Sequence, residues 1–353
     1  MSEPKGRRLV FAIPGDLSAP SGGYGYDRRM IGELGRLGWA VDVLALPAAF
    51  PFPAEADLRA SDEAFAALPD GTLVLVDGLA FGALPRLASA EASRLRLVAL
   101  VHHPLALEEG LAPEAAERLR SSEREALRHA RAVVSTSQTT RARLAAEFGV
   151  GVERITVVPP GTEPVAAAAP RGGSAEPLIL CVAALIERKD HAVLVDALGP
   201  LRGRPWRCRI VGSDTADPAT ARRLRERIAN AGLAGRIEVP GAVADIEAEY
   251  RRADLFALPS RFEGYGMAFA EAMAHALPVV GCAGGAVPEV VPPEAGLLVP
   301  PRDAPAFSSA LARLLDDAPL RARLSAGALA ASRALPGWAA SAAILSRTLE
   351  AIR

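Results

Sequence analysis

The chain is organised around residues 258–280, which read LPSRFEGYGMAFAEAMAHALPVV. Residues 253–258 predict a strand, a glycine-rich loop follows it, and an alanine-rich helix begins at about Met267. A strand, a glycine loop and a helix in this order present the free N–H groups of a helix N-terminus to an anion. Glu263 and Glu271 stand on either side of the loop, and carboxylates accept hydrogen bonds from paired hydroxyl groups. The stretch therefore predicts a site for a ligand that carries both an anion and a polyol such as ribose or a hexose.

Seven residues separate Glu263 from Glu271, and this spacing resembles the E-x7-E signature of the family-4 retaining glycosyltransferases of GT-B fold. The segment Pro278-Val279-Val280 stands in register with the same signature. The resemblance implies that Glu263 holds the donor sugar and that Glu271 holds the ribose of the nucleotide. The alternative is a solvated loop followed by one helical glutamate. The donor-binding residues that the resemblance implies are Gly22, Gly23, Gly264, Tyr265, Gly266, Met267, Ala268 and Glu271.

The bulk composition is that of a soluble α/β protein. The chain has 353 residues, half of them hydrophobic, which is enough for two domains of ordinary size. With 40 basic and 41 acidic residues the net charge is −1, so there is no overall attraction to nucleic acid or to an anionic membrane. The three cysteines form no close pair, which argues against a disulfide framework or a zinc site. No signal peptide and no transmembrane segment is predicted, so we expect a cytoplasmic location.

Alternating strand and helix patterns divide the chain into two α/β halves. We expect a first domain over residues 1–162, a linker rich in Ala, Pro and Gly over 163–177, and a second domain over 178–335. The resemblance implies that the last segment, 336–353, is a helix that packs back on the first domain. It also implies the GT-B fold, in which two doubly wound Rossmann-like domains face each other across a cleft.

A second glycine-rich segment, residues 18–25, follows the first predicted strand and is expected to be a loop before a helix that starts at Tyr26. Gly22 and Gly23 match a glycine pair that the family places against the donor diphosphate and the acceptor; a plain tight turn is the alternative. As a dinucleotide fingerprint the loop is poor. Its third glycine position holds Arg28, and no acidic residue ends the next strand to bind a ribose, so an NAD-dependent dehydrogenase is disfavoured.

Three further residues are candidates for the chemistry. His102 directly follows the predicted strand 95–101, and the resemblance implies that it approaches the donor sugar; a histidine that only caps the strand is the alternative. Lys189 matches the lysine that contacts the diphosphate in the family. The family commonly has an arginine shortly before that lysine, whereas this chain has Ala183-Ala184-Leu185, so Arg188 is the candidate for the missing charge. A solvated basic pair is the alternative for Arg188 and Lys189.

The sequence therefore predicts a retaining glycosyltransferase that moves a sugar from a UDP or GDP type donor to a hydroxyl acceptor. No Asp-x-Asp triplet occurs in the chain, so we expect no metal and no other cofactor. The expected partners are a nucleotide-sugar and a small-molecule, glycan or lipid-linked acceptor. A nucleotide-sugar epimerase of the same fold and a non-catalytic nucleotide-sugar-binding protein are the alternatives. The expected catalytic residues are Glu263, Lys189, Arg188 and His102.

Overall fold

The computed structural model describes residues 7–19, 21–165 and 175–352 and divides into two compact units. Unit 1 comprises Met1–Gly161 and Trp338–Arg353, and unit 2 comprises Thr162–Gly337. Most of the predicted linker, residues 166–174, lies outside the described residues. No helix within the described part of the chain combines the length and the apolar character needed to cross a membrane.

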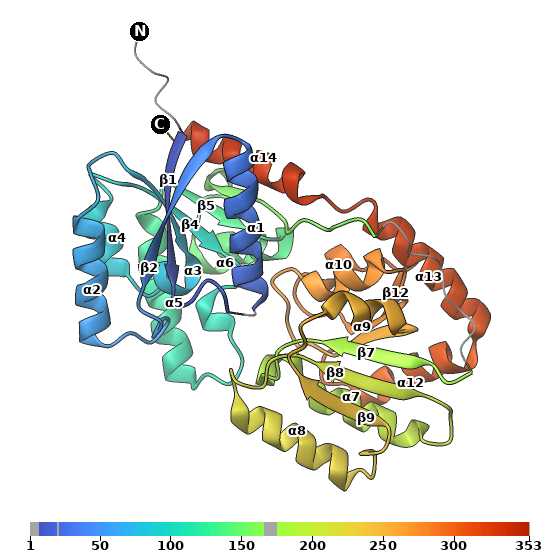
Figure 1. Ribbon diagram of the computed structural model, residues 1–353. Coiled ribbons are helices and arrows are strands. Elements are labelled where there is room, and N and C mark those ends of the chain that lie inside the picture. Colours follow the sequence, from blue (N-terminus) through green and yellow to red (C-terminus); the bar gives the residue numbers. More distant parts are fainter. Residues whose placement is uncertain (1–6, 20, 166–174, 353) are drawn as a thin grey trace. The chain divides into compact units, whose positions relative to one another are not determined.

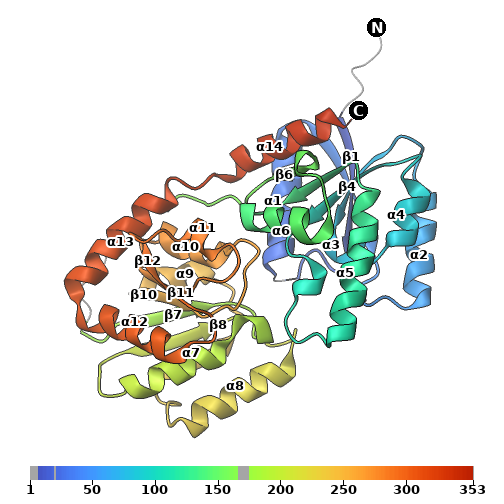
Figure 2. The ribbon, with the colours of Figure 1, turned by 180° about the vertical axis from the view of Figure 1, so that it is seen from behind.

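Unit 1 is a parallel six-stranded sheet in the order β2-β1-β3-β4-β5-β6, with helices on both faces (Figure 1). Helix α1 is in the foreground of Figure 1, whereas α5 and α6 are in the foreground of Figure 2. The central strands are continuous apolar runs because a parallel sheet that is covered on both faces is buried throughout. The elements are β1 (Arg7–Pro14), α1 (Gly22–Arg36), β2 (Trp39–Leu46), α2 (Glu55–Ala66), β3 (Leu73–Asp77), α3 (Gly78–Phe81), α4 (Pro85–Glu91), β4 (Arg96–Val101), α5 (Pro113–Arg128), β5 (Ala132–Ser135), α6 (Gln138–Phe148), β6 (Ile155–Val157) and α14 (Trp338–Ala351).

Helix α14, the last element of the chain, belongs to unit 1 and packs on α1. The ring of Trp338 lies edge-on to Tyr26 with 5.9 Å between the ring centroids, and the indole N–H of Trp39 donates to Oγ of Ser346 over 2.9 Å. Gly161 lies so close to Trp338 that a Cβ at this position would overlap the Trp338 backbone. Segments from the two ends of the sequence thus share one core.

Unit 2 repeats the architecture with the strand order β12-β11-β10-β7-β8-β9, again all parallel. In Figure 1, α9 and α10 lie above this sheet and α7, α8 and α12 lie below it. The elements are β7 (Leu178–Val182), α7 (His191–Leu198), β8 (Arg207–Val211), α8 (Pro218–Asn230), β9 (Ile237–Gly241), α9 (Ile246–Arg252), β10 (Leu255–Leu258), α10 (Met267–Ala274), β11 (Val279–Cys282), α11 (Val287–Val290), β12 (Gly296–Val299), α12 (Ala304–Asp316) and α13 (Ala318–Ser332). A short 3-10 helix, η3 (Glu187–Lys189), precedes α7.

Each sheet has one point at which its strand order reverses. In unit 1 the chain runs outward from β1 to β2 and then returns to the other side of β1 with β3. In unit 2 the chain runs outward from β7 to β8 and β9 and then returns to the other side of β7 with β10, so the reversal lies between the neighbouring strands β7 and β10. Ligands of open α/β sheets bind outside the carboxyl ends of the strands at such a reversal. The fold therefore singles out one place in each unit.

One predicted loop is wrong. Residues 22–25 are not a loop before a helix at Tyr26; they are the first residues of α1, which starts at Gly22. The reason is local, because Ser21 is the N-cap and its Oγ accepts a hydrogen bond from the N–H of Tyr24 over 3.2 Å. Gly22 and Gly23 thus lie at a helix N-terminus, where glycine costs little because the first N–H groups have no intrahelical partner.

Candidate functional site

The reversal point of unit 2 holds a cluster of opposite charges around Glu263. Glu263 follows β10, and Arg188 and Lys189 follow β7 in η3. The Nζ of Lys189 lies 2.6 Å from Oε1 and 2.8 Å from Oε2 of Glu263. Arg188 donates to the carbonyl oxygen of Phe262 over 2.8 Å, with its guanidinium 3.6 Å from Glu263 Oε2. Three of the predicted site residues therefore meet, although Glu263 and Lys189 lie 74 positions apart in the sequence.

The cluster is largely withdrawn from water. The side chain of Glu263 is 8% exposed, that of Lys189 16% and that of Arg188 15%. Burial alone would raise the pKa of Glu263, but Lys189 and Arg188 outweigh burial and hold the pKa below its ordinary value. Glu263 is therefore a carboxylate across the neutral range, with two cations beside it.

A second ion pair fixes the turn that carries Lys189. Arg261 donates to both carboxylate oxygens of Asp190, over 2.7 Å and 3.1 Å. The backbone N–H of Arg261 also donates to the carbonyl oxygen of Arg188 over 2.9 Å. Asp190 has a left-handed backbone with φ of 50°, so the chain turns sharply here before α7. Arg261 thus serves to hold the loop after β10 against the loop after β7.

The Gly284-Gly285 loop supports the same cluster from the far side. Glu263 and Gly285 form a parallel bridge, and the N–H of Ala286 donates to the carbonyl oxygen of Glu263 over 2.9 Å. A Cβ on Gly284 would overlap the Arg261 carbonyl, and one on Gly285 would overlap that of Glu263. Glycine is required at both positions because backbone lies against backbone.

Glu271 lies about one turn inside α10, as predicted, and two aromatic side chains hold it. The hydroxyl of Tyr250 donates to Oε2 of Glu271 over 2.8 Å. The ring of His275 stacks on Tyr250 at 5.0 Å, with one ring nitrogen 2.9 Å from the Glu271 carbonyl oxygen and the other 2.7 Å from Glu247. Burial raises the pKa of Tyr250 well above its ordinary value and the negative charge of Glu271 raises it further, so the phenol remains a donor.

Helix α10 begins at Met267, as the sequence predicts, and the anion site expected at its N-terminus stays a prediction. Gly266 is its N-cap with φ of 102°, a conformation that favours glycine. The first intrahelical hydrogen bond is donated by Phe269 to the carbonyl oxygen of Gly266, so the N–H groups of Met267 and Ala268 precede the hydrogen-bonded turn. Gly264 begins this loop, and the side chain of Tyr265 is only 9% exposed and packs into the core of unit 2.

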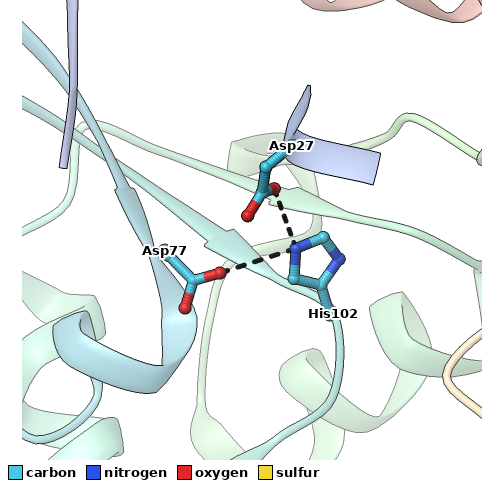
Figure 3. Close-up of side chains that lie close together, drawn as sticks. All are labelled: Asp27, Asp77 and His102. Carbon is cyan, nitrogen blue, oxygen red and sulfur yellow. Dashed lines mark hydrogen bonds and ion pairs between the residues drawn. The ribbon is translucent and has the colours of Figure 1, made fainter. Parts of the chain in front are cut away.

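The reversal point of unit 1 holds His102, which directly follows β4, together with two acids (Figure 3). The Nε2 of His102 lies 3.2 Å from Oδ1 of Asp27 and 3.6 Å from Oδ2 of Asp77. Both acids are buried, whereas 23% of the His102 side chain is exposed. Gly23 adjoins the imidazole, since a Cβ there would lie 3.5 Å from His102 Cδ2. Gly23 and His102 are thus neighbours, whereas a Cβ on Gly22 would point into open space.

The turn after His102 is fixed by a buried carboxyl group. Oε2 of Glu123, on α5, accepts the N–H of Leu105 over 2.8 Å, and Glu123 is 1% exposed. Burial raises the pKa of Glu123 from 4.5 to about 8. Glu123 is therefore protonated at neutral pH and anchors the chain between β4 and α5.

Within the described ranges, Asp27, Asp77 and His102 are also the group whose possible metal-ligand atoms lie within 4.8 Å of one another. His102 is joined to Asp27 by a hydrogen bond and to Asp77 by an ion pair. The expectation that the protein works without a metal stays a prediction. The three cysteines are buried and form no disulfide.

Sequence reasoning missed Asp27, Asp77 and Tyr250. Asp77 could have been predicted, because it is the last residue of a buried strand and ligands of α/β sheets bind at the carboxyl ends of the strands. Asp27 lies inside the helix in both the predicted and the observed boundaries, and its approach to His102 arises only from the tertiary fold. Tyr250 belongs to a short helix and reaches Glu271 only through the tertiary fold.

Comparison with known families is consistent with this geometry. Residues 70–165 match the family described as Glycosyltransferase Family 4, and residues 176–317 match the family described as glycosyl transferases group 1. The two matched ranges follow one another along the chain, one before and one after the predicted linker.

Among curated proteins, the chain is 35% identical over 213 residues to the lipopolysaccharide core biosynthesis mannosyltransferase LpsB of Rhizobium meliloti, covering 58% of this chain and 61% of that protein. It is 36% identical over 234 residues to a D-inositol 3-phosphate glycosyltransferase of Xylanimonas cellulosilytica, covering 61% of this chain and 55% of that protein. The chain thus spans little more than half the length of these relatives.

Among solved structures, a sucrose-phosphate synthase of Thermosynechococcus elongatus superposes with a TM-score of 0.82 at 25% identity, covering 98% of this chain and 100% of that one. The HepE protein of Anabaena, in complex with UDP and glucose, superposes with a TM-score of 0.77 at 18% identity over 98% of this chain and 100% of that one. These likenesses identify the two-sheet architecture as the GT-B fold.

Proposed function

The chain belongs to the family-4 and group 1 glycosyltransferases, and from this membership we propose that it transfers a sugar from a nucleoside diphosphate-sugar to a hydroxyl acceptor. The acceptor class that we propose is a small molecule, a glycan or a lipid-linked sugar. Relatives named for lipopolysaccharide core and inositol phosphate substrates support a hydroxyl-rich acceptor.

The observation that carries the proposal is the cluster of Glu263, Lys189 and Arg188 beside the N-terminus of α10. A nucleotide-sugar presents hydroxyl groups next to a diphosphate. Glu263 supplies a buried acceptor for hydroxyl groups, and the two cations supply positive charge within a few ångströms of it. A site that places a carboxylate next to two cations suits a donor with hydroxyl groups next to a diphosphate. It suits a neutral sugar or an isolated phosphate less well.

The same residues account for the bond cleavage. Breaking the bond between the sugar and the phosphate leaves negative charge on the departing diphosphate. Lys189, Arg188 and the N–H groups of Met267 and Ala268 would stabilise that charge in a site of low exposure, where electrostatic interactions are strong. We propose that this fixed positive charge takes the place of a metal ion.

The stereochemical proposal is retention of the anomeric configuration. In this proposal the acceptor attacks from the face that the diphosphate leaves, and the departing phosphate takes the acceptor proton. No protein general base is assigned, and His102 orients a substrate hydroxyl. Glu271, held by Tyr250, is proposed to bind the hydroxyls of the nucleotide ribose.

A ligand panel tests the donor class. We would measure thermal unfolding with UDP, GDP, dTDP, ADP and NAD side by side, in the presence of EDTA. A ligand at about a hundred times its dissociation constant should stabilise the protein by roughly 2.7 kcal/mol. Stabilisation by one diphosphate identifies the base of the donor, whereas stabilisation by NAD alone, or by none of the five, would overturn the proposal.

A matched pair of variants tests the ribose assignment. Glu271→Gln should weaken binding of that diphosphate by about 1–3 kcal/mol, the usual cost of a lost charged hydrogen bond. Glu226→Gln is the control, because Glu226 lies on the exposed surface of α8 in the same unit. Incubating the donor without any acceptor separates the alternatives, since an epimerase would isomerise it and a binding protein would leave it unchanged.

A further inference from the structure

We propose that Asp27 and Asp77 are positioning residues that hold the Nε2–H of His102, so that the other ring nitrogen, Nδ1, is presented to the substrate. This inference rests on the proposed function, because it assigns the orientation of the histidine that the proposed transferase uses. Neither acid was expected from the sequence, and neither belongs to the charge cluster of unit 2.

The contacts of His102 fix the orientation of its imidazole ring. Figure 3 shows Nε2 turned toward both carboxyl groups and the second ring nitrogen on the side of the imidazole that faces away from them. A carboxylate is only an acceptor, so a hydrogen bond between Asp27 Oδ1 and Nε2 requires the ring proton on Nε2. Nδ1 is then an acceptor in the neutral ring and a donor in the imidazolium. The acids thereby decide which nitrogen serves a ligand.

The burial of the acids argues for a role beyond packing. Asp27 is 0% exposed and Asp77 is 1% exposed. Two carboxyl groups out of water are costly unless charge and hydrogen bonds compensate them. Both acids adjoin His102, and the His102 side chain is the part of the cluster that is exposed to solvent. A group that only filled space at this point would be apolar, as the neighbouring strand residues are.

The protonation of the cluster agrees with the geometry. Burial, together with the adjacent charge of Asp27, raises the pKa of Asp77 to about 7. Burial lowers the pKa of His102, but Asp27 and Asp77 outweigh it and leave the pKa above its ordinary value. Tyr24 also faces this cluster, and burial with the nearby acids raises the pKa of its phenol, so it stays neutral.

The supports around the cluster keep it in place. Oδ1 of Asp77 accepts the N–H of Leu79 over 2.8 Å, because Asp77 is the N-cap of α3. Tyr26 lies edge-on to the His102 ring at 5.1 Å, and the hydroxyl of Thr136 donates to the His102 carbonyl oxygen over 3.3 Å. The imidazole is thus fixed from the strand side, the helix side and the backbone.

The test combines a spectrum that needs no turnover with a mutant cycle. We would record nitrogen-15 spectra of the histidine imidazoles and assign His102 from its loss in His102→Gln. Asp27→Asn keeps the shape and removes the charge, and Asp77→Asn is a second variant should the first fail to fold. Asp57→Asn is the control, because Asp57 accepts a backbone N–H of unit 1 on the distant α2.

In the wild type we expect the His102 signals of a ring protonated on Nε2. Asp27→Asn should shift them toward a mixture of the two tautomers and lower the titration midpoint of the ring, whereas Asp57→Asn should leave both unchanged. Unchanged His102 signals in both Asp27→Asn and Asp77→Asn would overturn the proposal. So would a stoichiometric metal ion in the purified protein that His102→Gln releases, because Nε2 would then be a ligand.

The mutant cycle measures whether the acids act through His102. Asp27→Asn should lower kcat/KM by roughly 10–100-fold, and combining it with His102→Gln should cost no more than His102→Gln alone. Fully multiplicative losses would contradict a positioning role. If no donor supports transfer at all, the proposed function fails, and the spectra still decide whether Asp27 and Asp77 hold the ring.

Discussion

The hydroxyl of Tyr250 lies 2.8 Å from Oε2 of Glu271 and donates to it a hydrogen bond from α9 to α10. Tyr250 is 1% exposed and is itself clamped by the stacked ring of His275. The bond occupies one oxygen of Glu271 and fixes the rotation of the carboxylate. The nucleotide pocket that we propose is therefore shaped by a residue that need not touch the nucleotide.

Replacing Tyr250 by phenylalanine should weaken binding of the preferred nucleoside diphosphate about five-fold, or about 1 kcal/mol. The reason is that Glu271 loses the hydrogen bond from Tyr250 that fixes the rotation of its carboxylate. Isothermal titration measures the affinity. The 2′-deoxy analogue of the same diphosphate should show a smaller effect of Tyr250→Phe, and an equal effect on both nucleotides would point to general loosening of α9.

Replacing Lys189 by methionine should lower kcat/KM at least about 100-fold, because the departing diphosphate loses a fixed positive charge. The same change should destabilise the protein by about 1–3 kcal/mol, since buried Glu263 loses its nearest cation. Steady-state kinetics and urea unfolding measure the two effects.

The double variant Lys189→Met with Glu263→Gln separates stability from catalysis. Removing both charges should recover at least half of the lost unfolding free energy and none of the lost activity. Recovery of activity in the double variant would show that Lys189 acts only by neutralising Glu263.

Replacing Glu123 by glutamine should flatten the dependence of stability on pH. The pKa of Glu123 is about 8 in the folded protein and near its ordinary 4.5 in the unfolded chain. Between these values the folded state holds a proton that the unfolded state has released, so this group's contribution to stability falls as pH rises, by about 1.4 kcal/mol per pH unit.

Glutamine cannot ionise and its oxygen can still accept the N–H of Leu105. Glu123→Gln should therefore melt increasingly above the wild type from pH 5 to pH 8, as thermal unfolding at a series of pH values would reveal. Glu117→Gln, an exposed change on the same helix, is the control. Parallel curves for wild type and Glu123→Gln would mean that Glu123 is ionised in the folded protein.

Replacing Gly161 by alanine should destabilise unit 1 by about 1–3 kcal/mol, because the new Cβ overlaps the backbone of Trp338 and α14 has to shift. Urea unfolding followed by tryptophan fluorescence measures the change. Gly32→Ala is the matched control: Gly32 lies inside α1 and a Cβ there would point into open space, so alanine should stabilise the helix by roughly 0.5–1 kcal/mol.

The fold and half of the candidate site could be predicted from the sequence, because the residues concerned lie close together along the chain. Glu263, Glu271 and the start of α10 form one continuous segment, so their spacing is visible in the chain. Lys189 was found through a family resemblance, and the structure brings it to Glu263.

Asp27 and Asp77 were inaccessible for a physical reason. Their role exists only once β1, β3 and β4 have been ordered in the sheet, which brings α1 and two strand ends together at one point. Tyr250 was likewise hidden, because a tyrosine on a short helix is more often a core residue, and this one is both core residue and donor.

The position of α14 has a consequence for biosynthesis. Unit 1 is built from the first part of the chain and from its last helix, whereas all of unit 2 lies between them in the sequence. Translation proceeds from the N-terminus, so the side of α1 that packs on α14 stays uncovered while the ribosome makes unit 2. Residues 162–337 are contiguous, so all of unit 2 has been synthesised before α14 is available to pack on α1.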